Sequence, residues 1–131
     1  MYLLDTNICI YIMNKRSLRA EKKIMSLPVG TVKLSAVSLG ELEFGVAKSS
    51  QREHNKDNLL RFVSDFEILP FDDSAAEIFG YIRADLAKRG QPIGPYDLQI
   101  AAQALAENLT LVTNNTAEFA RINGLKIENW L

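Results

Sequence analysis

Three acidic residues lie far apart in the sequence, but each occurs where a predicted strand ends or a predicted helix begins. Asp5 follows the apolar run 2–4, Glu41 follows a second apolar run, 32–36, within a helical turn, and Asp97 begins an alanine-rich helix. The carboxyl ends of parallel strands share one sheet edge, so we expect the three carboxylates to converge there. A divalent cation such as Mg²⁺ would relieve their repulsion and could activate a water against a phosphodiester. The pattern therefore predicts a metal-dependent nuclease site.

Further polar residues follow the same predicted strand ends. Thr6 and Asn7 come directly after the first aspartate, and Asn115 and Glu118 follow a later strand that ends at Thr113. Side-chain oxygens of these types can coordinate a hard cation or hold a neighbouring carboxylate by a hydrogen bond. We therefore include all five residues in the candidate site.

Most of these residues also have a purely structural interpretation. Ser38 with Glu41, and Asn115 with Glu118, have the spacing of a helix capping box, and we favour that role for Glu118. Asp97 could simply favour a helix amino terminus through the helix dipole. The aspartate that ends the first strand is harder to explain in this way, because a buried carboxylate without a partner is unfavourable.

Other catalytic chemistries are poorly supplied. His54 is the only histidine and lies in a polar stretch, so we interpret it as an exposed surface residue and exclude a mechanism that needs two histidines. Cys9 lies in an apolar segment, which favours a buried and inert thiol. The chain has no Gly-x-Ser-x-Gly motif and no glycine-rich phosphate loop. If the protein is an enzyme, its catalytic groups are therefore carboxylates together with a metal ion.

The composition is that of an ordinary folded domain. The 131 residues are 47% hydrophobic, which suffices for a core, and a single cysteine excludes a disulfide framework and favours a reducing compartment. No run approaches the roughly 20 apolar residues of a membrane span, and the features of a signal peptide are missing. We therefore expect a soluble cytoplasmic protein with no membrane partner.

The charge distribution is more informative than the net charge of −1, which alone does not predict a nucleic-acid binder. Five basic residues lie within nine positions, opposed only by one glutamate: Lys15, Arg16, Arg19, Lys22 and Lys23. They form either a solvated helix face or a phosphate-contacting rim around the acidic centre. The sequence leaves both interpretations open, and we keep the segment as a candidate RNA-binding surface.

Apolar periodicity and turn residues indicate the elements that must position these groups. Predicted strands alternate with predicted helices along the chain, which is typical of a parallel sheet covered on both faces. We therefore predict an α/β fold of three layers, with a central parallel sheet of four to five strands, in one domain over residues 1–131. Several helix starts are predicted from capping residues: Thr6 and Asn7 for the first helix, Ser38 for the third, and Asp73 with Ser74 for a later one.

Four short motifs, in this order and at this spacing, make the chain resemble a known family. They are Leu-Leu-Asp-Thr-Asn at 3–7, Ser-Leu-Gly-Glu-Leu at 38–42, Gly-Pro-Tyr-Asp at 94–97 with Ile-Ala-Ala at 100–102, and Leu-Val-Thr-Asn-Asn at 111–115. Over its whole length the chain resembles the PIN-domain ribonucleases, specifically the VapC toxins of VapBC toxin–antitoxin systems. The resemblance implies a PIN-like fold and endoribonuclease activity.

The resemblance also implies a catalytic set of Asp5, Glu41, Asp97 and Asn115. Asp5 and Asp97 would be the chief ligands of Mg²⁺ or Mn²⁺, with Glu41 completing the acidic pocket. Many PIN domains carry a fourth aspartate where this chain has Asn115, which brings no charge. Glu118 could compensate, so the sequence leaves open whether one or two metal ions bind.

For substrate and partners, the resemblance implies single-stranded or looped RNA, a homodimer, and a VapB antitoxin whose tail covers the site. The assembly with the antitoxin would be a heterotetramer or larger. We expect an amphipathic antitoxin segment against apolar helix faces near the site, with an arginine paired to the carboxylates. The Gly-Pro-Tyr-Asp and Thr-Asn-Asn motifs resemble the branch of endonucleases that cut initiator tRNA in its anticodon stem-loop.

Two other hypotheses compete with a nuclease. A catalytically inert RNA- or protein-binding module with a PIN-like fold is favoured by Asn115 and by the near-neutral charge. A phospho-acceptor domain is suggested only by the adjacent Asp72 and Asp73 after a predicted strand. We assign this pair to helix capping instead.

Overall fold

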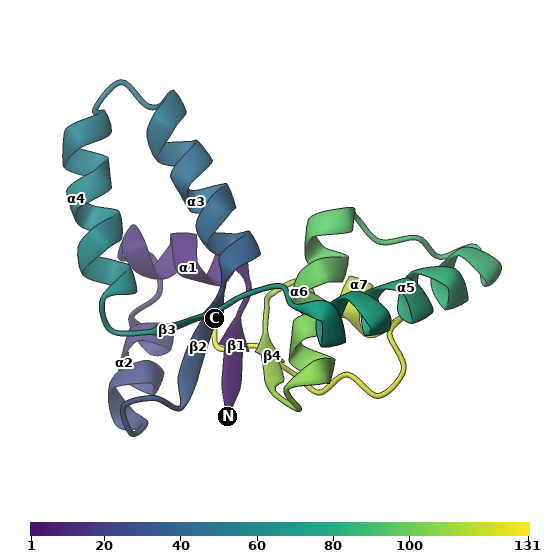
Figure 1. The fold of residues 1–131 in the computed structure, drawn as a ribbon. Helices are drawn as coiled ribbons and strands as arrows, with labels where there is room; N and C mark the ends of the chain where they lie inside the picture. The colour runs from purple at the N-terminus through teal and green to yellow at the C-terminus, as the bar shows by residue number, and fades with distance from the viewer.

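The computed structural model describes all 131 residues and has twelve regular elements. The strands are β1 (Tyr2–Leu4), β2 (Val32–Ser35), β3 (Glu67–Leu69), β4 (Thr110–Val112) and β5 (Ile127–Glu128). The helices are α1 (Thr6–Met13), α2 (Leu18–Ser26), α3 (Ala36–Lys48), α4 (Arg52–Val63), α5 (Asp73–Lys88), α6 (Pro95–Ala106) and α7 (Thr116–Phe119). Figure 1 shows how the helices surround the short strands.

All five strands are parallel and form one sheet in the order β3-β2-β1-β4-β5. β1 therefore lies at the centre, and its last residue, Leu4, pairs with Leu34 of β2 and Val112 of β4. The residues that follow these three in the chain, Asp5, Ser35 and Thr113, therefore lie at the same edge of the sheet, Ser35 as the last residue of β2. The predicted α/β fold with a central parallel sheet is confirmed.

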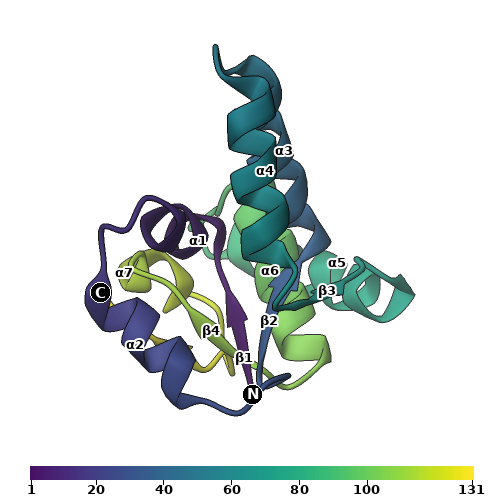
Figure 2. The same ribbon diagram turned by 90° about the vertical axis from the view of Figure 1, so that its left-hand side faces the viewer.

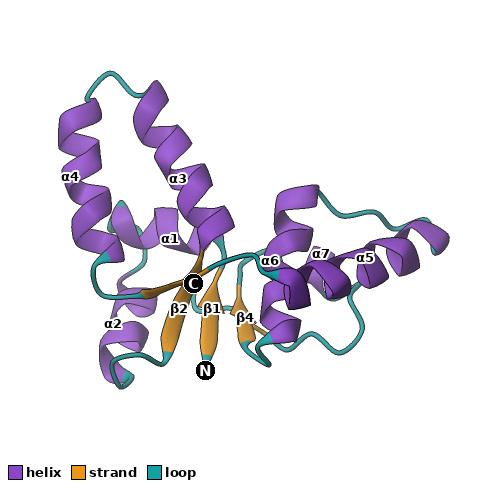
Figure 3. Cartoon of the chain, viewed as in Figure 1, coloured by secondary structure: helices purple, strands orange, loops and turns teal.

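The sheet separates two apolar cores, because successive side chains of a strand point to opposite faces. Leu3 and Leu111 face a core formed with α5, α6 and α7. Leu4, Leu34 and Val112 face the other core, which is formed with α1, α2, α3 and α4. Figure 3 shows the sheet between these two helical layers. All five of these leucine and valine residues are fully buried, so both cores exclude water at the sheet.

The caps of α3 and α5 differ from the predicted caps by one to three residues. α3 is capped by Ser35, and Ser38 lies within the helix, so the predicted capping box of Ser38 is not formed. α5 is capped by Asp72 rather than by Asp73 or Ser74. The assignment to capping is therefore confirmed for Asp72 but not for Asp73, whose carboxylate accepts from the adjacent Ser74 amide.

A helical hairpin of α3 and α4 extends beyond the carboxyl edge of the sheet. Figures 1 and 2, which differ by a turn about the vertical axis, both show the two helices rising side by side from that edge. The same views place α1 at the carboxyl edge and α2 lower, toward the amino ends of the strands. None of the helices combines the length and the apolar composition needed to cross a bilayer.

Candidate active site

Asp5 is the most tightly held residue of the predicted site. It caps α1, because its side chain accepts a hydrogen bond from the Ile8 amide at 3.0 Å, and only 3% of the residue is exposed. The Thr113 hydroxyl donates to its other carboxylate oxygen and itself accepts from the Asn115 amide. The cap is thus Asp5, whereas the sequence predicted Thr6 or Asn7. The backbone and Thr113 together fix the carboxylate at the strand end.

Thr6 connects α1 to α3 instead of capping a helix. Its hydroxyl lies 2.8 Å from a Glu41 carboxylate oxygen and 2.9 Å from the Ser38 hydroxyl. A carboxylate can only accept, so Thr6 donates to Glu41 and accepts from Ser38. This chain of hydrogen bonds orients Glu41 toward the sheet edge. Asn7 is exposed, and the structure gives its side chain no hydrogen bond.

Asp97 lies in the first turn of α6, which begins at Pro95 after Gly94. Proline suits the first helical position because its fixed φ matches the helix and its missing N–H is not needed there. The alanines of α6 are buried, which lets the helix pack closely on the sheet and brings its amino terminus to the carboxyl edge. The Asp97 carboxylate is half-buried and makes no hydrogen bond within the protein. Unlike Asp5, it accepts no hydrogen bond from a backbone amide or a hydroxyl group.

Asn115 and Glu118 meet at the start of α7. The Asn115 side-chain amide donates to a Glu118 carboxylate oxygen at 3.0 Å. The predicted capping role of Glu118 is not observed, and Asn115 at the cap position makes no side-chain capping bond. The pair instead holds the Glu118 carboxylate by an amide at a partly exposed position, the open side of the site.

The four carboxylates of Asp5, Glu41, Asp97 and Glu118 interact electrostatically. Burial, followed by the charges of Glu118, Asp5 and Glu41, raises the pKa of Asp97 to about 6. Burial also raises the pKa of Asp5, against the opposing effect of its hydrogen bonds, and the Glu41 charge adds a smaller increase. The salt bridges of the protein lie elsewhere, at Lys33–Glu67, Lys56–Glu43 and Arg89–Asp85. No lysine or arginine therefore neutralises this cluster.

The donor set fits a hard divalent cation that keeps part of its water shell. No group of three acidic, histidine or cysteine side chains is close enough to enclose an ion alone. The mutual effects on pKa nevertheless show that the carboxylates share one field. Mg²⁺ usually takes one or two carboxylates together with waters and phosphate oxygens. Asp5 and Asp97 are able to supply these carboxylates, with Glu41 and the Asn115–Glu118 pair around them.

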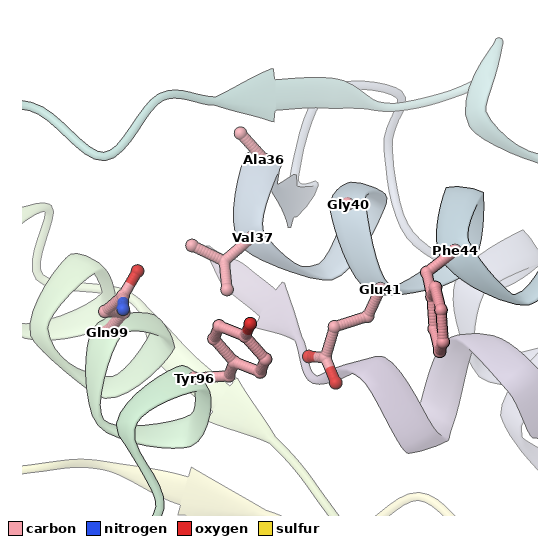
Figure 4. Close-up of a pocket in the computed structure, with 7 residues that line it drawn as sticks. All are labelled: Ala36, Val37, Gly40, Glu41, Phe44, Tyr96 and Gln99. Carbon is pink, nitrogen blue, oxygen red and sulfur yellow. The ribbon is translucent and has the colours of Figure 1, made fainter.

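A pocket of about 660 Å³ lies beside the acidic cluster, between α3 and α6. Its lining includes Glu41 together with Phe44, Tyr96 and Gln99, and Figure 4 shows the Tyr96 ring and the Glu41 carboxylate between the two helices, with Gln99 and Phe44 at opposite ends of the view. Sequence analysis did not assign a function to Phe44, Tyr96 or Gln99. The available signal was an aromatic residue directly before the predicted aspartate at 97, but only helix packing reveals the opposing phenylalanine.

The basic segment lies away from this pocket. Arg19, Lys22 and Lys23 line a separate hollow with the carboxyl-terminal Trp130, and Arg19 donates to the Leu131 carbonyl. Figures 1 and 2 place their helix, α2, toward the amino ends of the strands. Arg19, Lys22 and Lys23 therefore do not line the pocket beside the acidic centre. Their role as an RNA-binding surface remains a prediction.

Two other residues occur where the sequence predicted. Cys9 is fully buried in α1, and burial raises the pKa of its thiol, so the thiolate needed for reactivity is disfavoured. His54 is exposed on α4, with only Asn58 within hydrogen-bond distance. Neither residue takes part in the acidic cluster.

The family model described as PIN domain matches residues 2–125, nearly the whole chain. This chain belongs to the PIN-domain family. The resemblance found in the motifs is confirmed, and the fold of this PIN domain places the four motifs at one edge of its sheet.

Relatives match this PIN domain along their full lengths. Ribonuclease VapC2 of Rickettsia felis is 43% identical over 131 residues, which cover 99% of this chain and 98% of the relative. The tRNA(fMet)-specific endonuclease VapC of Shigella flexneri is 41% identical over 129 residues, covering 98% of this chain and 97% of the relative. The crystal structure of VapBC2 from Rickettsia felis bound to a promoter DNA fragment contains a chain with a TM-score of 0.94 and 42% identity, covering 99% of this chain and 98% of that one.

Proposed function

We propose that this PIN domain is the toxin of a VapBC-type toxin–antitoxin pair and acts as an endoribonuclease. The observation that carries the proposal is the gathering of four carboxylates, those of Asp5, Glu41, Asp97 and Glu118, at one edge of the sheet with no salt bridge to a cationic side chain. A fold does not need such a cluster, because uncompensated like charges oppose folding. The arrangement is useful if a cation and an anionic substrate complete it. The names of the full-length relatives agree with this activity.

The cofactor that we propose is Mg²⁺, with Mn²⁺ as a substitute. Asp5 and Asp97 would hold the ion, and it would supply charge stabilisation for a phosphodiester and an activated water. The protein's own contribution is positional. Asp5 is fixed by the Ile8 amide and the Thr113 hydroxyl, whereas Glu41 is oriented by Thr6. The number of ions stays open, because Asn115 brings no charge.

For the substrate we propose single-stranded or looped RNA, and within it initiator tRNA cut in the anticodon stem-loop. The support for tRNA is the printed name of the Shigella flexneri relative, at 41% identity over nearly the whole chain. Glu41 also lines the pocket of about 660 Å³ beside the cluster, which offers room for part of an RNA chain next to the carboxylates.

For partners we propose a VapB-type antitoxin and a homodimer of this chain, assembled as a heterotetramer or larger complex. A VapBC complex, that of Rickettsia felis, contains a chain with nearly the same fold. We propose that an amphipathic antitoxin segment covers the site and that one of its arginines pairs with the carboxylates. We place the pair in the cytoplasm, on the basis of a single, reduced cysteine.

The test is to map new RNA ends in the host after brief induction of the protein. We compare wild type, Asp97→Ala, and Asp72→Ala, which removes an exposed helix cap outside the site as a matched control. Wild type and Asp72→Ala should produce the same ends, and Asp97→Ala should lose them by about a hundredfold or more, because removing a metal ligand removes several kcal/mol of transition-state stabilisation.

The same proteins are then incubated with total RNA in Mg²⁺, in Mn²⁺ and in chelator. Cleavage by wild type should require a metal. Equal cleavage by a folded, nuclease-free Asp97→Ala preparation would contradict the proposed site. Intact RNA with folded wild type in both metals, together with salt-sensitive RNA binding, would instead support the inert module.

A further inference from the structure

Two aromatic side chains are exposed beside the acidic cluster, although burial is favourable for such rings. Phe44 on α3 is 65% exposed and Tyr96 on α6 is 58% exposed. A single exposed aromatic residue needs no explanation, but these two line the same pocket of about 660 Å³. Figure 4 shows the Glu41 side chain extending between the two rings. The pocket is therefore an aromatic site joined directly to the carboxylates.

Two polar groups of this pocket have no hydrogen-bond partner within the protein. Neither the Gln99 amide nor the Tyr96 hydroxyl makes a hydrogen bond within the chain, and Gln99 offers both a donor and an acceptor. The Lys48 ammonium lies 5.1 Å from the centre of the Phe44 ring and belongs to no salt bridge. The pocket thus combines two aromatic rings and an amide, and a lysine outside its lining contacts the Phe44 ring.

The chemistry of this pocket favours a base over a phosphate. Glu41 is a carboxylate within the lining, so a phosphate placed there would meet a negative charge. A nucleobase is neutral, and its flat face stacks on aromatic rings without regard to sequence. Tyr96 directly precedes Asp97 in α6, so a base on Tyr96 brings the adjoining phosphodiester toward the carboxylates. The volume lies within the usual range for a small-ligand site.

We propose that this pocket binds one unpaired nucleobase of the RNA, adjacent to the cleaved phosphodiester. Tyr96 provides the stacking face, Phe44 adds an apolar boundary beyond Glu41, and Gln99 forms hydrogen bonds with the edge of the base. The proposal rests on the proposed ribonuclease function and deepens it. It predicts a preference for an unpaired base next to the cut, because a base in a duplex would first have to be extruded from its stack at an energetic cost.

The binding test uses a synthetic stem-loop RNA with 2-aminopurine at successive loop positions. The protein carries Asp97→Asn, so that RNA binds in Mg²⁺ without being cut. At one loop position the fluorescence should be quenched when the base stacks, and Tyr96→Ala in this background should remove the quenching. Tyr96→Phe should retain it, because the ring face remains. Tyr81→Ala is the matched control, since Tyr81 is 77% exposed on α5 and lies outside the pocket.

The cleavage test uses otherwise wild-type protein and the RNA that it cuts, with and without an abasic nucleotide at the quenched position. Tyr96→Ala should lower kcat/KM about tenfold on intact RNA. On abasic RNA the same variant should differ from wild type by less than twofold, since no base is left to stack. Gln99→Leu should keep most of the rate and reduce the preference among the four bases at that position.

The outcomes separate this proposal from the proposed function. If wild type cleaves RNA but Tyr96→Ala changes neither quenching nor kcat/KM, the base pocket is wrong while the ribonuclease stands. If wild type never cleaves, yet Tyr96-dependent quenching occurs, the base pocket stands and the nuclease does not. An equal loss on intact and abasic RNA, or a loss confined to binding of a partner protein, would also overturn the base pocket.

Discussion

The two aspartates assigned to the cation lie in regions of opposite character. Asp5 ends a central strand, is almost completely buried, and accepts hydrogen bonds from Ile8 and Thr113. Asp97 begins a helix, is half-buried, and accepts none. The pKa of both is raised by burial, but hydrogen bonds oppose the rise at Asp5, whereas at Asp97 three carboxylates reinforce it.

The difference shows how a folded protein prepares a site for a cation. The strand-end carboxylate is part of the structure, because it caps α1 and joins β1 to the end of β4. The ionised Asp97 carboxylate needs a compensating positive charge, which no side chain of the protein supplies. Asp5 is therefore fixed before the ion binds, whereas the ionised form of Asp97 is destabilised until the ion binds.

The largest expected effect on stability comes from truncating each aspartate without metal. Asp5→Ala should lower the free energy of unfolding by about 1–2 kcal/mol, because it removes a helix cap and leaves the buried Thr113 hydroxyl without its acceptor. Asp97→Ala should raise it by about 1 kcal/mol at pH 8, because it removes repulsion and breaks no hydrogen bond. Urea unfolding in chelator measures both.

Asp72→Ala provides the control for this pair of variants. Asp72 caps α5 through a 3.0 Å hydrogen bond from the Ala75 amide, and it is exposed. Its truncation reports the loss of a cap alone, about 1 kcal/mol. If Asp97→Ala destabilised the protein as much as Asp5→Ala, the contrast between the two regions would be wrong.

The next effect is the response to Mg²⁺. At a concentration ten times its dissociation constant, Mg²⁺ should stabilise the wild type by about 1.4 kcal/mol, since a ligand of the folded state shifts the unfolding equilibrium. Asp97→Ala and Asp5→Ala should each lose most of this gain. Thermal unfolding measures the shift in Tm, and Ca²⁺-free and chelator-treated samples serve as references. An undiminished response in both variants would place the ion elsewhere.

Sequence patterns were sufficient for the edge of the sheet but not for its local contacts. The short apolar runs located the strand ends, so the convergence of Asp5, Glu41 and Asp97 at one edge followed from the parallel order. The first helix start was wrong because three adjacent polar residues all suit a cap. The register decides among them: Leu4 is the last paired residue of β1, so the chain turns at Asp5.

Long-range contacts were beyond the sequence. Ser38 and Glu41 have the spacing of a capping box, but the hydroxyl of Thr6, more than thirty positions away, takes both side chains into one hydrogen-bonded chain. The pocket between Phe44 and Tyr96 depends in the same way on how α3 packs against α6. Local spacing rules describe one element, whereas these contacts require the relative placement of two.

A smaller effect is expected from pH in the absence of metal. The pKa of Asp97 is about 6 in the folded protein, against 3.8 as its ordinary value, so the folded state holds the extra proton between these limits. The stabilisation that the protonated Asp97 carboxyl contributes is therefore fully present below pH 4 and is lost as the pH rises through 6. Asp97→Asn should reduce this fall by about 1 kcal/mol. Urea unfolding of both proteins from pH 4 to 8 measures it, and identical pH profiles would contradict the raised pKa.

The smallest effect concerns Asn115, whose amide donates to Glu118 on the open side of the site. Asn115→Asp replaces this hydrogen bond by repulsion between two half-exposed carboxylates, and should lower metal-free stability by about 0.5 kcal/mol. Mg²⁺ should restore the loss and bind severalfold more tightly, because the new charge joins the same field. Asn114→Asp is the matched control, since that side chain is exposed and makes no hydrogen bond. If the two variants behaved alike in urea and in Mg²⁺ titrations, the Asn115–Glu118 pair would lie outside the reach of the ion, and the open side of the site would serve the RNA rather than the cation.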